Sequence, residues 1–344
     1  MKIILKWSII LLISVVSLNC KKNKTEEVPI PVVTANSAFI KGADVSWISE
    51  MEAADIKFYN TDGVEQDLFL LLKNLGFNAI RLRIWVNPSN GWNNTTDVIA
   101  KALRAKAHGM KILLDFHYSD TWADPAHQTK PAAWEGLNFN VLKDSLKTHT
   151  ENVLQAVKNA QINPEWVQIG NETNNGMLWP EGKASTNMSN FAELIATGYQ
   201  AAKTIFPNTK VIVHVSNGWD NGLFRWMFDG LKNNNAQWDI IGMSLYPEPG
   251  NWSTLIAQCL VNMNDMVARY NKEVMIVEVG MSWDQASISK SFITDIISKT
   301  KSVTSNKGLG VFYWEPQSYN NWKGYTLGAF DNTGKPTEAL NAFK

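Results

Sequence analysis

The chain alternates short apolar runs with longer stretches in which apolar residues recur at helical spacing. The runs are Ile40–Trp47, Asn78–Trp85, Lys111–His117, Glu165–Asn171, Lys210–Ser216, Asp239–Tyr246, Glu273–Val279 and Leu309–Trp314. Continuous apolar runs of this length, rich in β-branched residues, are typical of strands buried on both faces. The pattern therefore predicts eight parallel strands.

The helical pattern between the runs is clearest in Val64–Leu75, Thr96–His108 and Phe139–Ala160. At the start of the first of these, Asp62 and Glu65 have the spacing of a capping box, and Gly76 follows its end. Eight strands, each followed by a helix, are the count that a closed (β/α)₈ barrel requires. Because no change of composition marks an internal boundary, we predict one α/β domain, a TIM barrel over residues 37–344.

Polar and aromatic side chains stand at the C-terminal ends of the runs, where packing alone would favour Val, Ile or Leu. They are Asp44, Trp47, Arg81, Arg83, Trp85, Asp115, His117, Tyr118, Asn171, Glu172, His214, Asn217, Tyr246, Glu278, Trp314 and Glu315. The following loops add Trp92, Asp120, Trp122, Asp124, Trp179 and Trp283. In a barrel these positions share one face, which carries the active site. Acids, amides and tryptophans together suit sugars, whose hydroxyls need polar partners and whose C–H faces stack on rings.

Two of the runs end abruptly in a glutamate, Glu172 in WVQIGNE and Glu278 in VMIVEVG. Two carboxylates at one barrel mouth could flank a glycosidic bond. The alternative is that both are ordinary strand-end acids paired with arginines. His117 and His214 could likewise be core histidines bonded to backbone carbonyls.

Composition narrows the function further. The 344 residues carry 32 basic and 32 acidic side chains without a basic stripe, which argues against a nucleic-acid partner. Fifteen tryptophans are more than a core needs and favour flat platforms for ligands, although many will be packing residues. Asp115, Asp120 and Asp124 match no cation-loop spacing, so hydrogen bonds that shape their loop explain them better than a metal does.

The first residues, MKIILKWSIILLISVVSLNC, have two lysines, an apolar stretch and then Cys20. We expect residues 1–20 to be a lipoprotein signal with Cys20 as the lipidated residue, although Asn19 stands where a small residue is usual. An ordinary cleaved signal with an incidental cysteine is the alternative. Residues 21–36 are charged, then rich in Pro and Val, and would tether the domain to a membrane through the lipid only. This predicts an outer-membrane lipoprotein that faces the periplasm or the cell surface.

Several segments carry a resemblance to a known family. GADVSWISEMEAADIKFYNTDG, RLRIWVNPSNGWN, LLDFHYSDTWADPAHQTKPAAW, IGNETNNGMLWPEG, IIGMSLYPEPGNW, IVEVG and VFYWEP follow in order. From about Lys41 to the C-terminus the chain resembles the endo-β-1,4-galactanases of glycoside hydrolase family 53. The resemblance implies a (β/α)₈ barrel that cuts internal β-1,4 bonds of galactan, including arabinogalactan side chains of pectin, with retention of configuration.

The resemblance also implies roles for residues. Glu172 would be the acid/base and Glu278 the nucleophile. For galactan or galactooligosaccharides, it implies that Asn171 holds the sugar 2-hydroxyl, Tyr246 lies beside the nucleophile, Arg83 or Arg81 pairs with Glu278, His117 lines the cleft and Trp314 lies under the sugar. Apart from the resemblance, we expect substrate contacts from Asp120, Trp85, Trp92, Trp122 and Trp179. Trp92, Trp122 and Trp179 lie in loops, which favours exposure and stacking on sugars, with packing within the loop as the alternative.

Some bacterial members of that family carry a calcium-binding insertion after strand seven. Here Gly280–Gln285 leads almost directly into a helix, so we expect no calcium and no other cofactor. A monomer is expected. Two other functions stay open: an endo-glycanase of the same clan that acts on mannan, xylan or β-glucan, and a non-catalytic glycan-binding lipoprotein. A non-catalytic binding protein would usually have lost one of the two carboxylates, whereas Glu172 and Glu278 are both present.

Overall fold

Eight parallel strands close into a barrel in the order β1 to β8, with β8 paired to β1. The strands are β1 Ile40–Asp44, β2 Ala79–Ile84, β3 Lys111–Phe116, β4 Trp166–Ile169, β5 Lys210–Val215, β6 Ile240–Leu245, β7 Glu273–Val279 and β8 Gly308–Trp314. Each lies within or beside one of the apolar runs, so the predicted (β/α)₈ barrel is confirmed. The structure is a computed structural model that describes residues 38–344; the expected signal and tether lie outside these residues.

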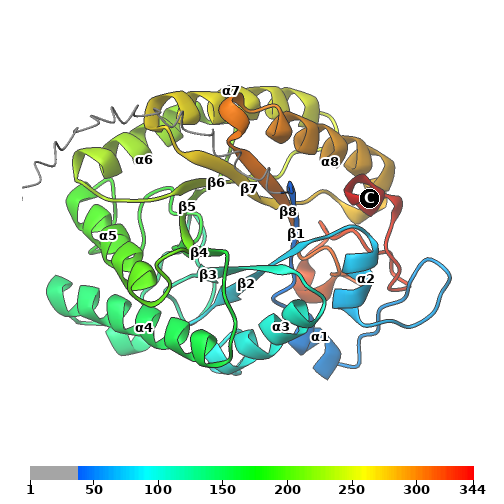
Figure 1. Cartoon of the computed structure of the whole chain (residues 1–344), viewed down its shortest axis with the longest axis horizontal. Helices are drawn as coiled ribbons and strands as arrows, with labels where there is room; N and C mark the ends of the chain where they lie inside the picture. Colours follow the sequence, from blue (N-terminus) through cyan, green and yellow to red (C-terminus); the bar gives the residue numbers. More distant parts are fainter. Residues whose placement is uncertain (1–37) are drawn as a thin grey trace, which may run out of the picture. The chain divides into compact units, whose positions relative to one another are not determined.

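Helices ring the barrel and cover its outer face (Figure 1). They are α1 Ile48–Ala53, α2 Leu68–Asn74, α3 Thr95–Ala107, α4 Phe139–Asn159, α5 Met188–Ile205, α6 Asn221–Asn233, α7 Trp252–Tyr270 and α8 Ala286–Lys301. The expected start of α2 at Val64 was wrong. Its N-cap is Asp67, whose carboxylate accepts from the backbone N–H of Leu70. Glu65 instead pairs with Tyr59 in an isolated antiparallel bridge before the helix.

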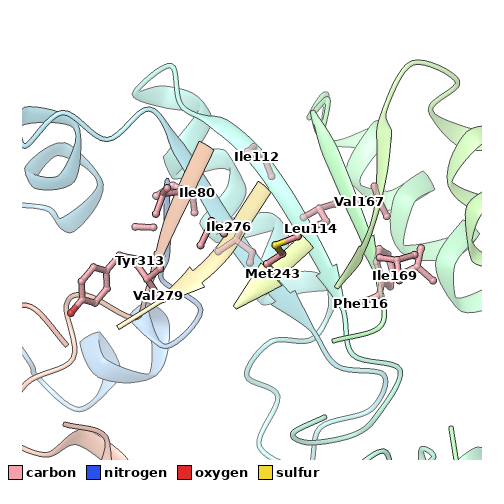
Figure 2. Packing of buried hydrophobic residues seen from close by; sticks show 14 of the residues in the cluster. Ile80, Ile112, Leu114, Phe116, Val167, Ile169, Met243, Ile276, Val279 and Tyr313 are labelled. Atoms are coloured by element: carbon pink, nitrogen blue, oxygen red, sulfur yellow. The ribbon is translucent and has the colours of Figure 1, made fainter. Parts of the chain in front are cut away.

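Buried apolar residues form two separate clusters, one on each face of the barrel wall. The smaller cluster draws on all eight strands and on no helix, so it fills the barrel interior: Ile40, Ala79, Leu113, Trp166, Ile212, Ile240, Met275, Val277 and Phe312. The larger cluster joins the outer face of the strands to the helices, and Figure 2 shows part of it, including Ile80, Leu114 and Ile169. Neighbouring strand residues such as Ala79 and Ile80 point to opposite faces, as the two-residue period of a strand requires.

Strand β7 carries an irregularity that changes this alternation near its C-terminal end. Met243 pairs with Ile276, but the next residue, Ser244, pairs with Glu278, so β7 has one extra residue. Val277 belongs to the interior cluster, and a strict two-residue period would therefore turn Glu278 outward. Because of the bulge, the side chain of Glu278 points to the mouth of the barrel. Bulges often redirect a side chain in this way beside active sites.

Among residues 38–344, no helix is long and apolar enough to cross a bilayer.

Candidate active site

A cavity of about 450 Å³ opens at the C-terminal ends of the strands. It is lined by Trp47, His117, Trp122, Ala123, Asp124, Asn171, Glu172, Tyr246, Glu278, Trp314, Lys323, Gly324, Tyr325 and Leu327. Both predicted catalytic glutamates are in this lining. So are five of the residues expected to contact the substrate, Asn171, His117, Trp122, Tyr246 and Trp314.

Glu278 receives two strong donors. The guanidinium Nη1 of Arg81 lies 2.8 Å from its Oε1, and the hydroxyl of Tyr246 donates to its Oε2 at 2.8 Å. Arg81 is fully buried and also pairs with Asp44 at 2.9 Å and Asp115 at 2.8 Å. Burial alone would lower the pKa of Arg81, but these carboxylates raise it, so the guanidinium stays charged. Of the two arginines expected beside the nucleophile, Arg81 is therefore the one in contact.

Glu172 has a different environment. It follows β4 in a turn with a left-handed backbone (φ 43°), and its Oε1 accepts a hydrogen bond from the hydroxyl of Ser244 at 2.7 Å. Burial raises the pKa of Glu172 to about 6, while the Ser244 hydroxyl acts to lower it. A pKa in this range suits a group that must both give and take a proton near neutral pH.

The two carboxyl groups act on each other as well. Burial raises the pKa of Glu278 as well, the charge of Arg81 and the Tyr246 hydroxyl act to lower it, and a charge on Glu172 would raise it further. Such a pair holds one proton between its members over an intermediate pH range. A charged guanidinium and a phenol face Glu278, whereas a single neutral hydroxyl faces Glu172. Because donors of that strength stabilise an ionised carboxylate, we place the negative charge on Glu278 and the proton on Glu172.

Asn171 and His117 are held rigidly at the cavity wall. The Asn171 Oδ1 accepts from Arg81 Nη2 at 2.9 Å, and its Nδ2 donates to the carbonyl of Ala123 at 2.8 Å. The Nδ1 of His117 faces two donors at 3.3 Å, Trp85 Nε1 and the backbone N–H of Ala123. Its Nε2 therefore carries the hydrogen and donates to Asp115 at 3.0 Å. The orientation of each polar group toward a ligand is thus set before a ligand binds.

Aromatic rings form the apolar side of the cavity. Trp47 lies edge-on to Trp122 with ring centroids 5.8 Å apart and to Trp314 at 5.1 Å, and Tyr325 lies 4.7 Å from Trp314. We call Trp47, Trp122, Trp314 and Tyr325 the aromatic wall. Rings of this kind stack on the C–H faces of sugars, while the acids and amides opposite them can bond hydroxyls.

Arg83 lies behind the aromatic wall, which corrects its expected contact to substrate. It is 1% exposed, pairs with the buried Glu315 at 2.8 Å, and places its guanidinium carbon 4.3 Å from the ring centre of Trp122. Its Nε and Nη2 have no hydrogen-bond partner among the described residues. The guanidinium instead makes cation–π contacts with the rings of Trp122 and Trp47.

Four further residues expected to bind substrate are absent from the lining of this cavity. Trp85 is buried and supports His117, and the carboxylate of Asp120 accepts from the backbone N–H groups of Asn87 and Ala132. Asp120 thus shapes its loop. Trp92 and Trp179 are partly buried in loops, where Trp179 Nε1 donates to a backbone carbonyl.

Ser244, Lys323 and Tyr325 were not found by sequence reasoning. Ser244 carried one signal that could have identified it, since it stands two residues before Tyr246 on the same face of a strand end. Lys323 and Tyr325 lie in the loop after β8, whose residues show no periodicity. No group of three or more His, Cys, Asp or Glu in the described part of the chain could hold a metal ion.

Comparisons with known proteins give a consistent result. A family model described as "Glycosyl hydrolase family 53" matches residues 40–343. An arabinogalactan endo-β-1,4-galactanase of Thermothelomyces thermophilus is 33% identical over 332 residues, which cover 88% of this chain and 98% of that protein. An endo-β-1,4-galactanase of Bacillus subtilis is 32% identical over 311 residues, covering 82% and 70%. Among solved structures, a chain from a study of two fungal β-1,4-galactanases superimposes with a TM-score of 0.82 at 33% identity, covering 88% of this chain and 98% of that one.

Proposed function

Because this chain belongs to glycosyl hydrolase family 53, we propose that it hydrolyses internal β-1,4-galactosidic bonds of galactan and arabinogalactan with retention of configuration. The named relatives support the substrate. The observation that supports this mechanism is that the two glutamates in the cavity face different hydrogen-bond donors. Glu278 faces a guanidinium and a phenol, and Glu172 faces one hydroxyl.

In the first step Glu278 attacks the anomeric carbon as a carboxylate, and the bond from that carbon to the glycosidic oxygen breaks. Glu172 gives its proton to that oxygen, which leaves as a sugar hydroxyl. Esterification of Glu278 removes the negative charge next to Glu172, so Glu172 is now stable as a carboxylate. In the second step Glu172 takes a proton from water, the water oxygen bonds the anomeric carbon, and the ester bond breaks to restore ionised Glu278.

The rigid groups around the pair fit the bound sugar. Asn171, fixed by Arg81 and the Ala123 carbonyl, is placed to hold the 2-hydroxyl of the sugar at the cleavage point. Trp314 supplies an apolar floor for the same sugar. Hydrogen bonds that strengthen in the transition state are what such pre-oriented groups contribute to catalysis.

Removal of either carboxylate tests this assignment. We expect Glu172→Gln and Glu278→Gln each to lower the release of reducing ends from galactan by about 10²–10⁴-fold, with circular dichroism unchanged. Glu193→Gln, an exposed glutamate of α5 paired with Lys143, is the matched control and should keep full activity. Near-normal activity in either active-site variant contradicts the assignment.

A substrate panel separates the two rival functions. Wild-type protein is assayed on galactan, mannan, xylan and mixed-linkage glucan. Release from galactan alone supports the proposal, whereas release from one of the other polymers indicates a different endo-glycanase. Binding to galactan without release indicates a glycan-binding protein. The anomeric configuration of the first product, followed by NMR, tests retention.

For the N-terminal segment we propose lipidation at Cys20 and attachment to the outer membrane as a monomer. The apolar stretch that ends in Cys20 and the polar segment after it support this proposal from the sequence.

A further inference from the structure

Ser244 joins the candidate acid/base to the interior of the barrel. It stands near the C-terminal end of β6, is 1% exposed, and is absent from the residues that line the cavity. Its hydroxyl oxygen lies 2.7 Å from Oε1 of Glu172 and 2.6 Å from Nε2 of His214. Ser244 therefore contacts the carboxyl group of Glu172 from the barrel interior, on the side away from the cavity in which the sugar would bind.

We propose that Ser244, oriented by His214, is a positioning residue that reserves Oε1 of Glu172, so that Oε2 alone exchanges the proton with the glycosidic oxygen and with water. This inference rests on the acid/base role proposed for Glu172. Neither the sequence motifs nor the family relationship assigned a role to Ser244.

His214 determines the direction of the Ser244 hydroxyl. The imidazole is completely buried in β5, and burial, aided by the charge of Arg81, holds its pKa well below the usual value, so the ring is neutral. A neutral ring has one N–H. When that hydrogen is on Nε2, it donates to Ser244 Oγ, and the serine hydrogen is directed to Glu172 Oε1.

The surroundings of the other ring nitrogen favour this tautomer. The Nδ1 of His214 faces the backbone N–H of Glu172 at 3.4 Å. Nε2 of Gln168 lies 3.3 Å from Nδ1, but its two hydrogens have nearer acceptors, Oδ1 of Asp115 at 2.6 Å and the carbonyl of Gly170 at 3.0 Å. The third neighbour of Nδ1, Asn171 Oδ1 at 3.0 Å, already accepts from the charged Arg81 at 2.9 Å. An Nδ1 without hydrogen can accept from the backbone N–H of Glu172, which a protonated Nδ1 could not.

The same histidine also holds the backbone that carries Glu172. The carbonyl of His214 accepts from the backbone N–H of Thr173 at 2.9 Å and from its hydroxyl at 3.0 Å. These bonds fix the turn in which Glu172 has its left-handed φ of 43°. With the backbone held by His214 and Oε1 held by Ser244, the carboxyl group cannot rotate without losing a buried hydrogen bond.

The charged and titratable groups that act on Glu172 come from several elements. They are Arg81 of β2, Asp115 of β3, Asp124 of the loop after β3, His214 of β5, Tyr246 directly after β6 and Glu278 of β7. All of them remain when Ser244 is replaced, although Ser244→Ala also removes the partner of His214 Nε2. Ser244→Thr keeps both hydrogen bonds, so the comparison of the two variants measures the hydroxyl.

The experiment compares Ser244→Ala with wild-type protein on two aryl β-1,4-galactotriosides. The phenyl glycoside needs proton donation to its leaving group, whereas the 2,4-dinitrophenyl glycoside leaves without it. We expect kcat/KM for the phenyl substrate to fall by about 10- to 100-fold and for the dinitrophenyl substrate to change by less than about threefold. Ser318→Ala is the matched control, since Ser318 is 2% exposed and its hydroxyl has no partner in the described part of the chain.

The pH profile gives a second readout. The Ser244 hydroxyl stabilises ionised Glu172, so its removal raises the pKa of Glu172. The basic limb of kcat/KM for the phenyl substrate should then move to higher pH, and Ser244→Thr, which keeps the hydroxyl, should restore the wild-type limb. A purely structural role would leave the limb in place.

Equal losses on the two substrates, or a basic limb that stays or moves to lower pH, overturn the inference. Failure of the proposed function is distinguishable, because wild-type protein would then turn over neither glycoside. If wild-type protein is active and Ser244→Ala loses the same activity on both glycosides, the role proposed for Ser244 is refuted and the proposed function is not affected.

Discussion

At the scale of single residues, the contact between Tyr246 and Glu278 is open to a direct test. The hydroxyl of Tyr246 donates to Oε2 of Glu278 at 2.8 Å, and this hydrogen bond lowers the pKa of Glu278. Tyr246→Phe removes that hydroxyl. Without it, that pKa rises, so the acid limb of kcat/KM should move to higher pH and kcat/KM on galactan should fall by about 10- to 100-fold. Steady-state rates across pH check both effects. An unchanged acid limb would show that Tyr246 does not stabilise the charge on Glu278.

At the scale of elements, the ion pair between β2 and the end of β8 supports the aromatic wall. Arg83→Met leaves Glu315 as an unpaired buried carboxyl group, and we expect it to lower the free energy of unfolding by about 3–5 kcal/mol. Arg83→Met combined with Glu315→Gln removes both charges and should recover much of that loss. Urea denaturation measures the three proteins. If single and double variants lose the same free energy, the contacts of Arg83 with the tryptophans matter more than its charge.

At the scale of the whole molecule, the N-terminal segment and the barrel have separable roles in the proposal. Cys20→Ala removes the expected lipid acceptor but no residue of the barrel. We expect the variant to move from the membrane fraction to the soluble fraction while its specific activity on galactan is unchanged. Fractionation with immunoblotting measures the first effect and a reducing-sugar assay the second. Retention of the variant in the membrane fraction would contradict anchoring through Cys20.

The sequence by itself determined the order of the elements and the chemistry at the strand ends. Apolar runs long enough for buried strands, separated by helical stretches, allow few other folds, and all eight expected strands are present. The positions of Glu172 and Glu278 followed from the same pattern, because strand ends of a parallel barrel must meet at one face. The boundary of α2 was missed, since two competing caps, Asp62 and Asp67, have similar local signals.

Only the tertiary structure decided which side chains touch. Arg81 and Arg83 are two residues apart on one strand and are chemically identical, yet one pairs with Glu278 and the other lies behind tryptophans. The bulge in β7 that turns Glu278 inward depends on pairing with β6, which one strand's sequence does not reveal. Ser244 and His214 meet Glu172 only because β5 pairs with β4 and β6 pairs with β5. Periodicity specifies the face of a strand, whereas contacts across the barrel depend on register and closure, which arise from all eight strands together.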